Sequence, residues 1–269
     1  MMKFSSLLAS RRARHRRRRI AVEIDDIVVY AIGDVHGCLG ELLELEAMIV
    51  ADSAGLPAGK LIVMLGDYVD RGPSSAQVLD HLTAPPPDGF ERLCLAGNHE
   101  IAMLDYLEGR ISRGEWLRMG ASPTLTSYGM DYERLKAIYG IDGDIDGMIR
   151  ATIPSSHRSF LHSLPMMATG GRIVFVHAGI RPERSLDQQT DMDLVTIRSG
   201  FFDQAHLLRN YVVHGHTPVD RPARDGKRIN IDTGAYYSGR LSAVRIWRGR
   251  GRFLATEGKS SQIESAGSR

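Results

Sequence analysis

The chain has 269 residues, of which 43% are hydrophobic and 25% are charged. This balance is typical of a globular protein, and it excludes a fibrous or wholly disordered chain. The formal net charge is +2, but residues 1–20 contribute eight positive charges and no acid, so the other residues carry a net charge of −6.

Residues 1–20 are predicted to form a disordered basic tail, because they hold seven arginines and no apolar periodicity. The short apolar piece 4–9 precedes the charges, which is the reverse of a signal peptide. A solvated tail is the simplest interpretation. A transit peptide, or a weak contact with nucleic acid or an anionic surface, is the alternative.

The rest of the chain is predicted to be one α/β domain over residues 21–255, followed by a C-terminal tail over 256–269. Helical patterns at 39–51 and 74–83 separate the first three strands, which implies parallel pairing. Residues 110–165 are predicted to be a helical cap or insert. Strands are predicted at 27–32, 61–65, 92–96, 173–176, 211–213, 229–231 and 241–247, with an edge strand after 249.

No transmembrane segment or signal peptide is predicted. The two cysteines, Cys38 and Cys94, fit a reduced compartment, so the cytoplasm is the expected location. Neither cysteine is assigned a role.

Five predicted strands each end in a glycine-punctuated loop that carries polar side chains. In α/β sheets such strand ends meet at one edge, where sites form. Helix capping would explain any one of these loops, but not five together. Their carboxylate, amide and imidazole groups suit manganese, iron or zinc in two adjacent sites that share a carboxylate. The loops are residues 33–37, 66–72, 97–100, 177–179 and 214–217.

These loops resemble the calcineurin-like metallophosphoesterases, in which the patterns GDxHG, GDxVDRG and GNHE occur in this order. Within that superfamily they are most similar to the phosphoprotein phosphatase branch, of the bacterial serine/threonine phosphatase type. The resemblance covers residues 27–247. It implies an α/β fold of central mixed β-sheets sandwiched by helices, in four layers α/β/β/α.

The resemblance also implies two divalent metal ions, with manganese expected and iron or zinc as alternatives. Asp34, His36 and Asp67 would bind the first ion, and Asp67 would bridge to the second. Many members have a further histidine where this chain has Pro218, which favours the phosphatase branch with water completing the first site. The second ion would be bound by Asp67, Asn98, His177 and His216.

The same resemblance implies direct attack on phosphorus by a hydroxide that bridges the two metals. His99 would donate a proton to the leaving group, with Asp70 as its orienting partner. Arg71 and, on a looser pattern, Arg198 would bind the phosphoryl oxygens. Asn98, His99 and Tyr236 complete the predicted substrate-binding set. Glu100 is interpreted as a first-turn acid favoured by the helix dipole.

The first functional hypothesis is a phosphatase that acts on phosphoserine or phosphothreonine in proteins, and on small phosphoesters. The alternative is a dinucleoside tetraphosphate hydrolase, because bacterial enzymes of that type are similar at GDVHGC, including Cys38. Those enzymes typically carry GDLVARG and GNHD, so Asp70 and Glu100 favour the phosphatase. A third hypothesis is a regulatory phosphatase tethered to nucleic acid by the arginine-rich tail.

Overall fold

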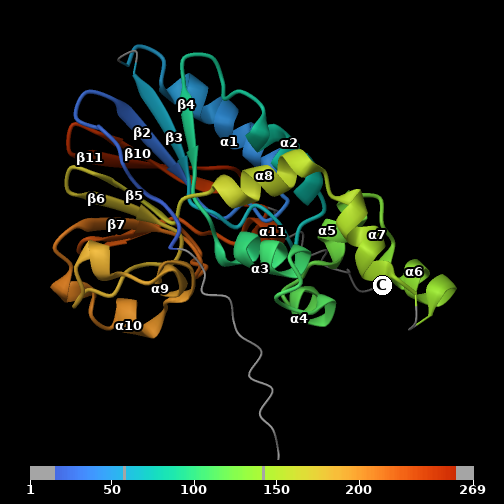
Figure 1. The fold of residues 1–269 in the computed structure, drawn as a ribbon. Helices are drawn as coiled ribbons and strands as arrows, with labels where there is room; N and C mark the ends of the chain where they lie inside the picture. The colour runs from blue at the N-terminus through green and yellow to red at the C-terminus, as the bar shows by residue number, and fades with distance from the viewer. Residues whose placement is uncertain (1–15, 57–58, 141–142, 259–269) are drawn as a thin grey trace, which may run out of the picture.

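Two β-sheets face each other in the computed structural model, which describes residues 16–56, 59–140 and 143–258 (Figure 1). The five-stranded sheet has the order β11 (Arg250–Ala255), β10 (Ser242–Trp247), β2 (Val28–Ile32), β3 (Lys60–Met64) and β4 (Glu91–Cys94). The six-stranded sheet has the order β1 (Arg19–Ala21), β5 (Met167–Gly170), β6 (Ile173–Val176), β7 (Tyr211–His214), β9 (Arg228–Asn230) and β8 (Ala223–Asp225).

Helices cover the outer face of each sheet. In Figure 1, α1, α2 and α8 lie on the side of the five-stranded sheet, and α9 and α10 lie on the side of the six-stranded sheet. The predicted four-layer α/β/β/α arrangement is therefore confirmed. The helices are α1 (Leu39–Asp52), α2 (Ser75–Thr83), α3 (Asn98–Leu107), α4 (Arg113–Arg118), α5 (Ser122–Ser127), α6 (Tyr132–Tyr139), α7 (Ile145–Thr152), α8 (Ser155–Ser163), α9 (Asp191–Thr196), α10 (Ser199–Phe202) and α11 (Ala235–Ser238), with short 3₁₀ turns at Leu186–Gln188 and Ala205–Leu207.

The core has two parts because alternate residues of a strand point to opposite faces of its sheet. In β2, Val29 and Ala31 pack between the two sheets, whereas Tyr30 and Ile32 pack under the helices. All five residues of β2 are buried, which explains its uninterrupted apolar sequence. On the helix side, α1 buries the stripe Leu42, Leu45 and Ile49.

Parallel pairing brings the predicted site loops to one end of both sheets. Strands β2, β3 and β4 run parallel in one sheet, and β6, β7 and β9 run parallel in the other. The carboxyl ends of the first set carry the loops of Asp34, Asp67 and Asn98. The carboxyl ends of the second set carry the loops of His177 and His216.

The structure corrects the predicted extent of the basic tail. Residues 1–15 lie outside the described residues, but β1 begins at Arg19 and pairs with β5. The Arg19 guanidinium lies 2.8 Å from the Asp191 carboxylate, and Arg17 donates to the Leu161 and Leu164 carbonyls. These arginines therefore bind the fold instead of extending into solvent. At the other end, Thr256 still exchanges hydrogen bonds with Leu241.

Residues 110–165 hold α4 to α8, in line with the predicted helical content. Strands β5 and β8 and helices α9 and α10, each three to six residues long, are not among the elements that the sequence patterns predict. None of the helices within the described ranges is long and apolar enough to cross a membrane.

Candidate metal centre

The loops of the predicted site are held in an unusual backbone conformation. Six residues other than glycine have a positive φ in the described part of the chain, and five of them lie in these loops. A positive φ is costly for a residue with a side chain, and such strain gathers at functional sites. The five residues are His36, Asp67, Asp70, Arg71 and His216.

One group of donors gathers around His177. Its Nε2 lies 3.0 Å from Asn98 Oδ1, 3.2 Å from His216 Nδ1 and 3.4 Å from Asp67 Oδ1. Its Nδ1 lies 3.1 Å from the Leu65 carbonyl and donates to it, which leaves a lone pair on Nε2 facing the group. The four residues predicted to share one ion are thus in contact.

A second group gathers on the other oxygen of Asp67. Asp67 Oδ2 lies 3.4 Å from His36 Nε2 and 3.8 Å from His99 Nε2. His36 Nδ1 donates to the Val69 carbonyl at 2.9 Å, so its Nε2 also presents a lone pair. Asp34 lies beside the first group, where its carboxylate accepts from the His216 backbone N–H at 3.1 Å and lies 4.0 Å from His177 Nδ1.

The charges in this cluster are poorly balanced without a cation. Burial and the neighbouring Asp232 and Asp67 raise the pKa of Asp34 well above its usual value. Burial would also raise the pKa of Asp67, but His177 and His99 hold it well below its usual range. Burial lowers the pKa of His36 and of His216 to about 3, so both rings are neutral, as a metal ligand requires.

Two overlapping sets of side chains could therefore each hold a metal ion. Within each set the ligand atoms lie within 4.8 Å of one another, and Asp67 belongs to both. Buried carboxylates, neutral imidazoles and an amide oxygen fit a divalent ion of the manganese, iron or zinc type. The sets are His36, Asp67 and His99, and Asp67, His177 and His216. Asp34, the predicted ligand of the first ion, is in neither set, and His99, the predicted proton donor, stands in its place.

Two arginines and a tyrosine border the cluster. Arg71 NH1 lies 3.0 Å from His36 Nε2, and Arg198 Nε lies 3.2 Å from His216 Nε2. The Arg71 guanidinium stacks over the Tyr236 ring at 5.1 Å, and the same ring meets His36 edge-on at 5.5 Å. The structure thus brings these three of the five predicted substrate-binding side chains to the metal-ligand groups, to which the other two, Asn98 and His99, already belong.

The predicted pair of His99 and Asp70 is formed. His99 Nδ1 lies 2.8 Å from Asp70 Oδ2, and both side chains are buried. Burial lowers the pKa of His99, but Asp67 and Asp70 outweigh it, and the net pKa is raised. Because Asp70 engages Nδ1, the remaining ring nitrogen Nε2 faces Asp67 and the cluster.

Sequence patterns did not identify the residues that orient Asp70. Thr124 Oγ1 donates to Asp70 Oδ1 at 2.8 Å, and Trp116 Nε1 donates to Asp70 Oδ2 at 3.3 Å. The Gly120 carbonyl accepts from the Arg71 backbone N–H at 2.8 Å. Helices α4 and α5 and the turn between them therefore set the position of the Asp70–Arg71 segment.

Glu100 has a larger role than that of a first-turn acid, which is what the sequence predicts for it. Its Oε2 accepts from the backbone N–H groups of Gly97 and Asp67 at 2.9 and 2.8 Å. Its Oε1 accepts from the N–H groups of Tyr68 and Val69 at 2.7 and 3.2 Å. One carboxylate thus caps its own helix and fixes the loop that carries Asp67. The glutamate three residues after Gly97, as in a capping box, was the only local sign.

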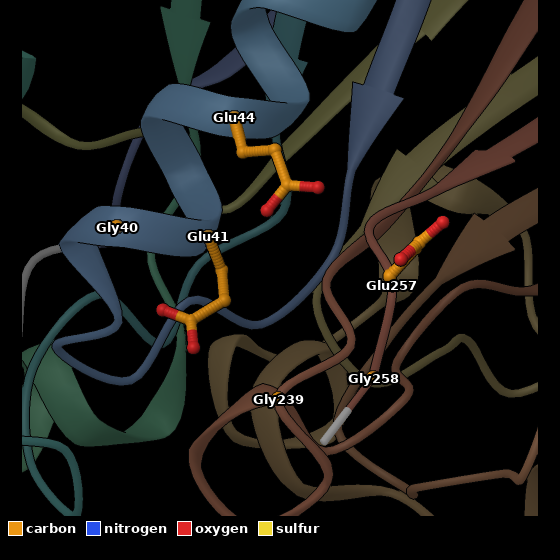
Figure 2. Close-up of a pocket in the computed structure, with 6 residues that line it drawn as sticks. All are labelled: Gly40, Glu41, Glu44, Gly239, Glu257 and Gly258. Carbon is orange, nitrogen blue, oxygen red and sulfur yellow. The ribbon is translucent and has the colours of Figure 1, made fainter. Parts of the chain in front are cut away.

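A separate hollow lies beside α1 (Figure 2). Glu41 and Glu44 of α1 point into it, and Glu257 approaches from the C-terminal segment. Gly40, Gly239 and Gly258 complete the lining. It contains no member of the metal-ligand groups.

Known proteins are similar to this chain over most of its length. A family model described as calcineurin-like phosphoesterase matches residues 27–247. The asymmetrical bis(5'-nucleosyl)-tetraphosphatase PrpE of Halalkalibacterium halodurans is 28% identical over 238 residues, covering 80% of this chain and 88% of the relative. The protein of the same name from Bacillus subtilis is 25% identical, covering 80% and 89%.

Two solved structures are similar in fold. One, a "putative diadenosine tetraphosphatase", has a TM-score of 0.61 and 21% identity, covering 90% of this chain and 98% of the other. The cold-active protein-tyrosine phosphatase of a Shewanella species has a TM-score of 0.52 and 21% identity, covering 88% and 82%. At this identity the two structures support the fold alone.

Proposed function

The chain belongs to the calcineurin-like phosphoesterase family, and on that premise we propose that it hydrolyses dinucleoside tetraphosphates with the help of two divalent metal ions. The observation that carries this substrate is the similarity to two tetraphosphatases along nearly nine-tenths of their length. The relatives thus favour a dinucleoside tetraphosphate hydrolase, which is the alternative that the GDVHGC pattern indicates. They do not favour a serine/threonine phosphatase.

Asp67 would be the ligand shared by the two ions, and this is supported by the contact of each of its oxygens with a different group of imidazoles. Two ions bound there would supply an activated water and neutralise charge on the phosphoryl oxygens. Asp34 and His36 would hold one ion, and Asn98, His177 and His216 the other. Manganese and a cytoplasmic location stay predictions.

The arginines would bind the polyphosphate chain. Arg71 and Arg198 lie against different imidazoles, those of His36 and His216, so each group of predicted ligands has a guanidinium beside it. Planar guanidinium groups match phosphoryl oxygens in geometry and in charge. Tyr236, which Arg71 contacts, is 36% exposed. Its ring would line the side of the substrate site where Arg71 binds the phosphoryl oxygens.

Hydrolysis of phosphomonoesters, including phosphoserine and phosphothreonine, is the second candidate function, and the pair of His99 and Asp70 favours it. A serine or threonine alkoxide is a poor leaving group and needs a proton, which His99 Nε2 can donate. A departing nucleoside phosphate is already a stable anion and needs no such help.

Turnover on defined substrates tests the first proposal. Purified protein loaded with manganese is incubated with diadenosine tetraphosphate, with a phosphoserine peptide and with an aryl phosphate. We expect the highest kcat/KM on the tetraphosphate, with a nucleoside triphosphate and a monophosphate as products. A higher kcat/KM on the phosphopeptide would reject the tetraphosphate as the preferred substrate.

The variant Asp70→Asn separates the two candidate functions. Loss of the carboxylate removes the orientation of His99, so kcat on phosphoserine should fall by about 10²-fold. On the tetraphosphate, kcat should fall much less, because that leaving group needs no proton. Equal losses on both substrates would contradict proton donation by His99.

A further inference from the structure

A second cavity opens between the two sheets, at the end of the molecule opposite the metal centre. Its volume is about 440 Å³, which is within the range of small-molecule sites, roughly 300 to 1,000 Å³. It is lined by the first residues of β6 and β7, Ile173 and Tyr211. The metal ligands follow the last residues of the same strands. A strand of four residues is roughly 13 Å long, so the two sites are separate.

The inner walls of this cavity are apolar. Val29, Val244 and Ile246 of the five-stranded sheet face Ile173 and Ile229 of the six-stranded sheet, and all five belong to the core between the sheets. Phe253, which is 39% exposed, stands at the entrance. Val29 and Val244 are only 1% exposed, so they form the floor of the cavity. Its solvent-facing apolar surface comes from Phe253 and the half-buried Ile173 and Ile229.

Glycines leave the cavity free of side chains that would otherwise fill it. Gly251 pairs with Ile246 in the β10–β11 ladder, so its missing side chain would point to the same face as Ile246. A Cβ at Gly251 would lie 3.7 Å from Val244, in ordinary van der Waals contact. Its backbone has no positive φ, so a larger residue fits there without strain. Gly171 and Gly249, which lie in the hairpin turns of the rim, add no side chain either.

The rim of the cavity is strongly basic. Four arginines line it, against the single acid Asp25. Arg224 stacks on the Tyr211 ring at 5.0 Å, and Arg248 stacks on the Trp247 ring at 5.0 Å. No ion pair is found for any of the four among the described residues. The four are Arg172, Arg224, Arg248 and Arg250.

We propose that this cavity binds a single-chain carboxylic acid of medium length, with its carboxylate among the rim arginines and its alkyl chain between the sheets. An apolar interior is favourable only for an apolar chain. Arg224 donates to the Gly226 carbonyl and the Tyr211 hydroxyl, so the other three guanidinium groups are the ones available to a ligand. Guanidinium groups without a carboxylate partner favour an anion over a neutral or cationic ligand. A polyphosphate would satisfy the arginines and leave the apolar walls in contact with water.

Titration with dodecanoate below its micellar concentration tests this proposal on the full-length, manganese-loaded protein. Calorimetry should show one binding event per chain. In methyl-labelled protein, the Ile229 and Ile246 resonances should shift, whereas that of Ile49, on the buried face of α1, should not. Dodecyltrimethylammonium, which has the same chain and the opposite charge, and acetate, which lacks the chain, should both bind at least about tenfold more weakly.

Two variants locate the site. Gly251→Leu should fill the cavity and abolish dodecanoate binding. The double variant Arg248→Glu, Arg250→Glu should weaken binding by at least about tenfold, because the carboxylate then meets like charge. Arg134→Glu, an exposed arginine on α6 without an ion pair among the described residues, should bind as the unmodified protein does.

Thermal melting confirms that each variant is folded before it is titrated. The proposal is overturned if dodecanoate does not bind, if the cation binds equally well, or if the folded Gly251→Leu protein keeps its affinity. It is also overturned if only methyl groups outside the cavity shift. These readouts do not involve hydrolysis, so they stand apart from the proposed phosphoesterase activity.

Discussion

At the scale of single residues, Glu100 holds the loop of Asp67, the predicted shared metal ligand. Both of its oxygens are used by backbone N–H groups, and the carboxylate is buried. Asp67 has a φ of 53°, a conformation that needs such support. Glu100 touches no predicted substrate position, so it acts as a positioning residue for the metal ligand.

The variant Glu100→Gln should reveal this role. An amide has one acceptor oxygen, so at least two of the four N–H groups lose their partner, at about 1–3 kcal/mol each. Metal affinity should fall by about 10–100-fold, as measured by calorimetric titration with manganese. Glu115 forms a similar capping box on the exposed start of α4, and Glu115→Gln is the control. Equal metal affinity in both variants would exclude the positioning role.

We expect the buried His214 to make the free energy of unfolding depend on pH. Burial lowers its pKa from 6.5 to about 3 in the folded protein. Between these values the unfolded chain binds a proton that the folded protein does not, so stability falls as pH falls from about 6.5 towards 3.

Urea unfolding of the chelator-treated protein at pH 4.5 to 7.5 measures this dependence. Relative to the unmodified protein, His214→Gln should reduce the slope below pH 6 by about 1.4 kcal/mol per pH unit. An unchanged slope would show that His214 does not remain neutral in the fold.

At the scale of elements, helices α4 and α5 act as a brace for the Asp70–Arg71 segment. Trp116 of α4 and Thr124 of α5 both donate to the Asp70 carboxylate, and the turn between the helices accepts from Arg71. Asp70 and Arg71 have φ values of 70° and 69°, so the segment depends on these contacts. The helical insert predicted for residues 110–165 thus reaches the candidate site directly.

The variant Thr124→Val tests the brace, since it keeps the side-chain shape and removes the hydroxyl. We expect kcat on an alkyl phosphate to fall by about tenfold, with a smaller change in KM, because His99 is less well oriented. Thr126→Val, on the exposed side of the same helix, is the matched control. If the two variants have the same kcat, the brace is not required for proton donation.

At the scale of the whole molecule, the metal centre connects the two sheets. Asp67 and Asn98 follow strands of the five-stranded sheet, whereas His177 and His216 follow strands of the six-stranded sheet. Ions held by both sets would cross-link the carboxyl ends of the sandwich. The cavity between the sheets lies at the opposite end.

Removal of metal should therefore lower stability as well as activity. A ligand present at 100 times its dissociation constant stabilises the folded state by about 2.7 kcal/mol, which is a few degrees in Tm for a chain of this size. Calorimetric melting with chelator and then with added manganese measures this shift. Asp67→Asn should show little response to manganese, and a full response in that variant would contradict the shared-ligand role.

The sequence by itself determined the family, the principal strands and the identity of the residues that gather at the site. Each strand-and-loop unit, such as 28–36, carries its own local signature of apolar residues, glycine and polar ligand. Because the strands that carry the loops pair in parallel within each sheet, the loops at their carboxyl ends lie along one edge of that sheet. The grouping of Asp67 with His177, which follow strands of different sheets, came from the family resemblance, and the structure brings the two side chains to 3.4 Å.

Only the tertiary structure decided what supports these residues. Glu100 bonds to the Asp67 backbone 33 positions earlier, and Thr124 bonds to Asp70 across 54 positions. Arg19, predicted to lie in a disordered tail, pairs with Asp191 across 172 positions. Such contacts join one residue to another far along the chain and leave no periodic pattern in either segment. They become visible only when the fold has brought the two segments together.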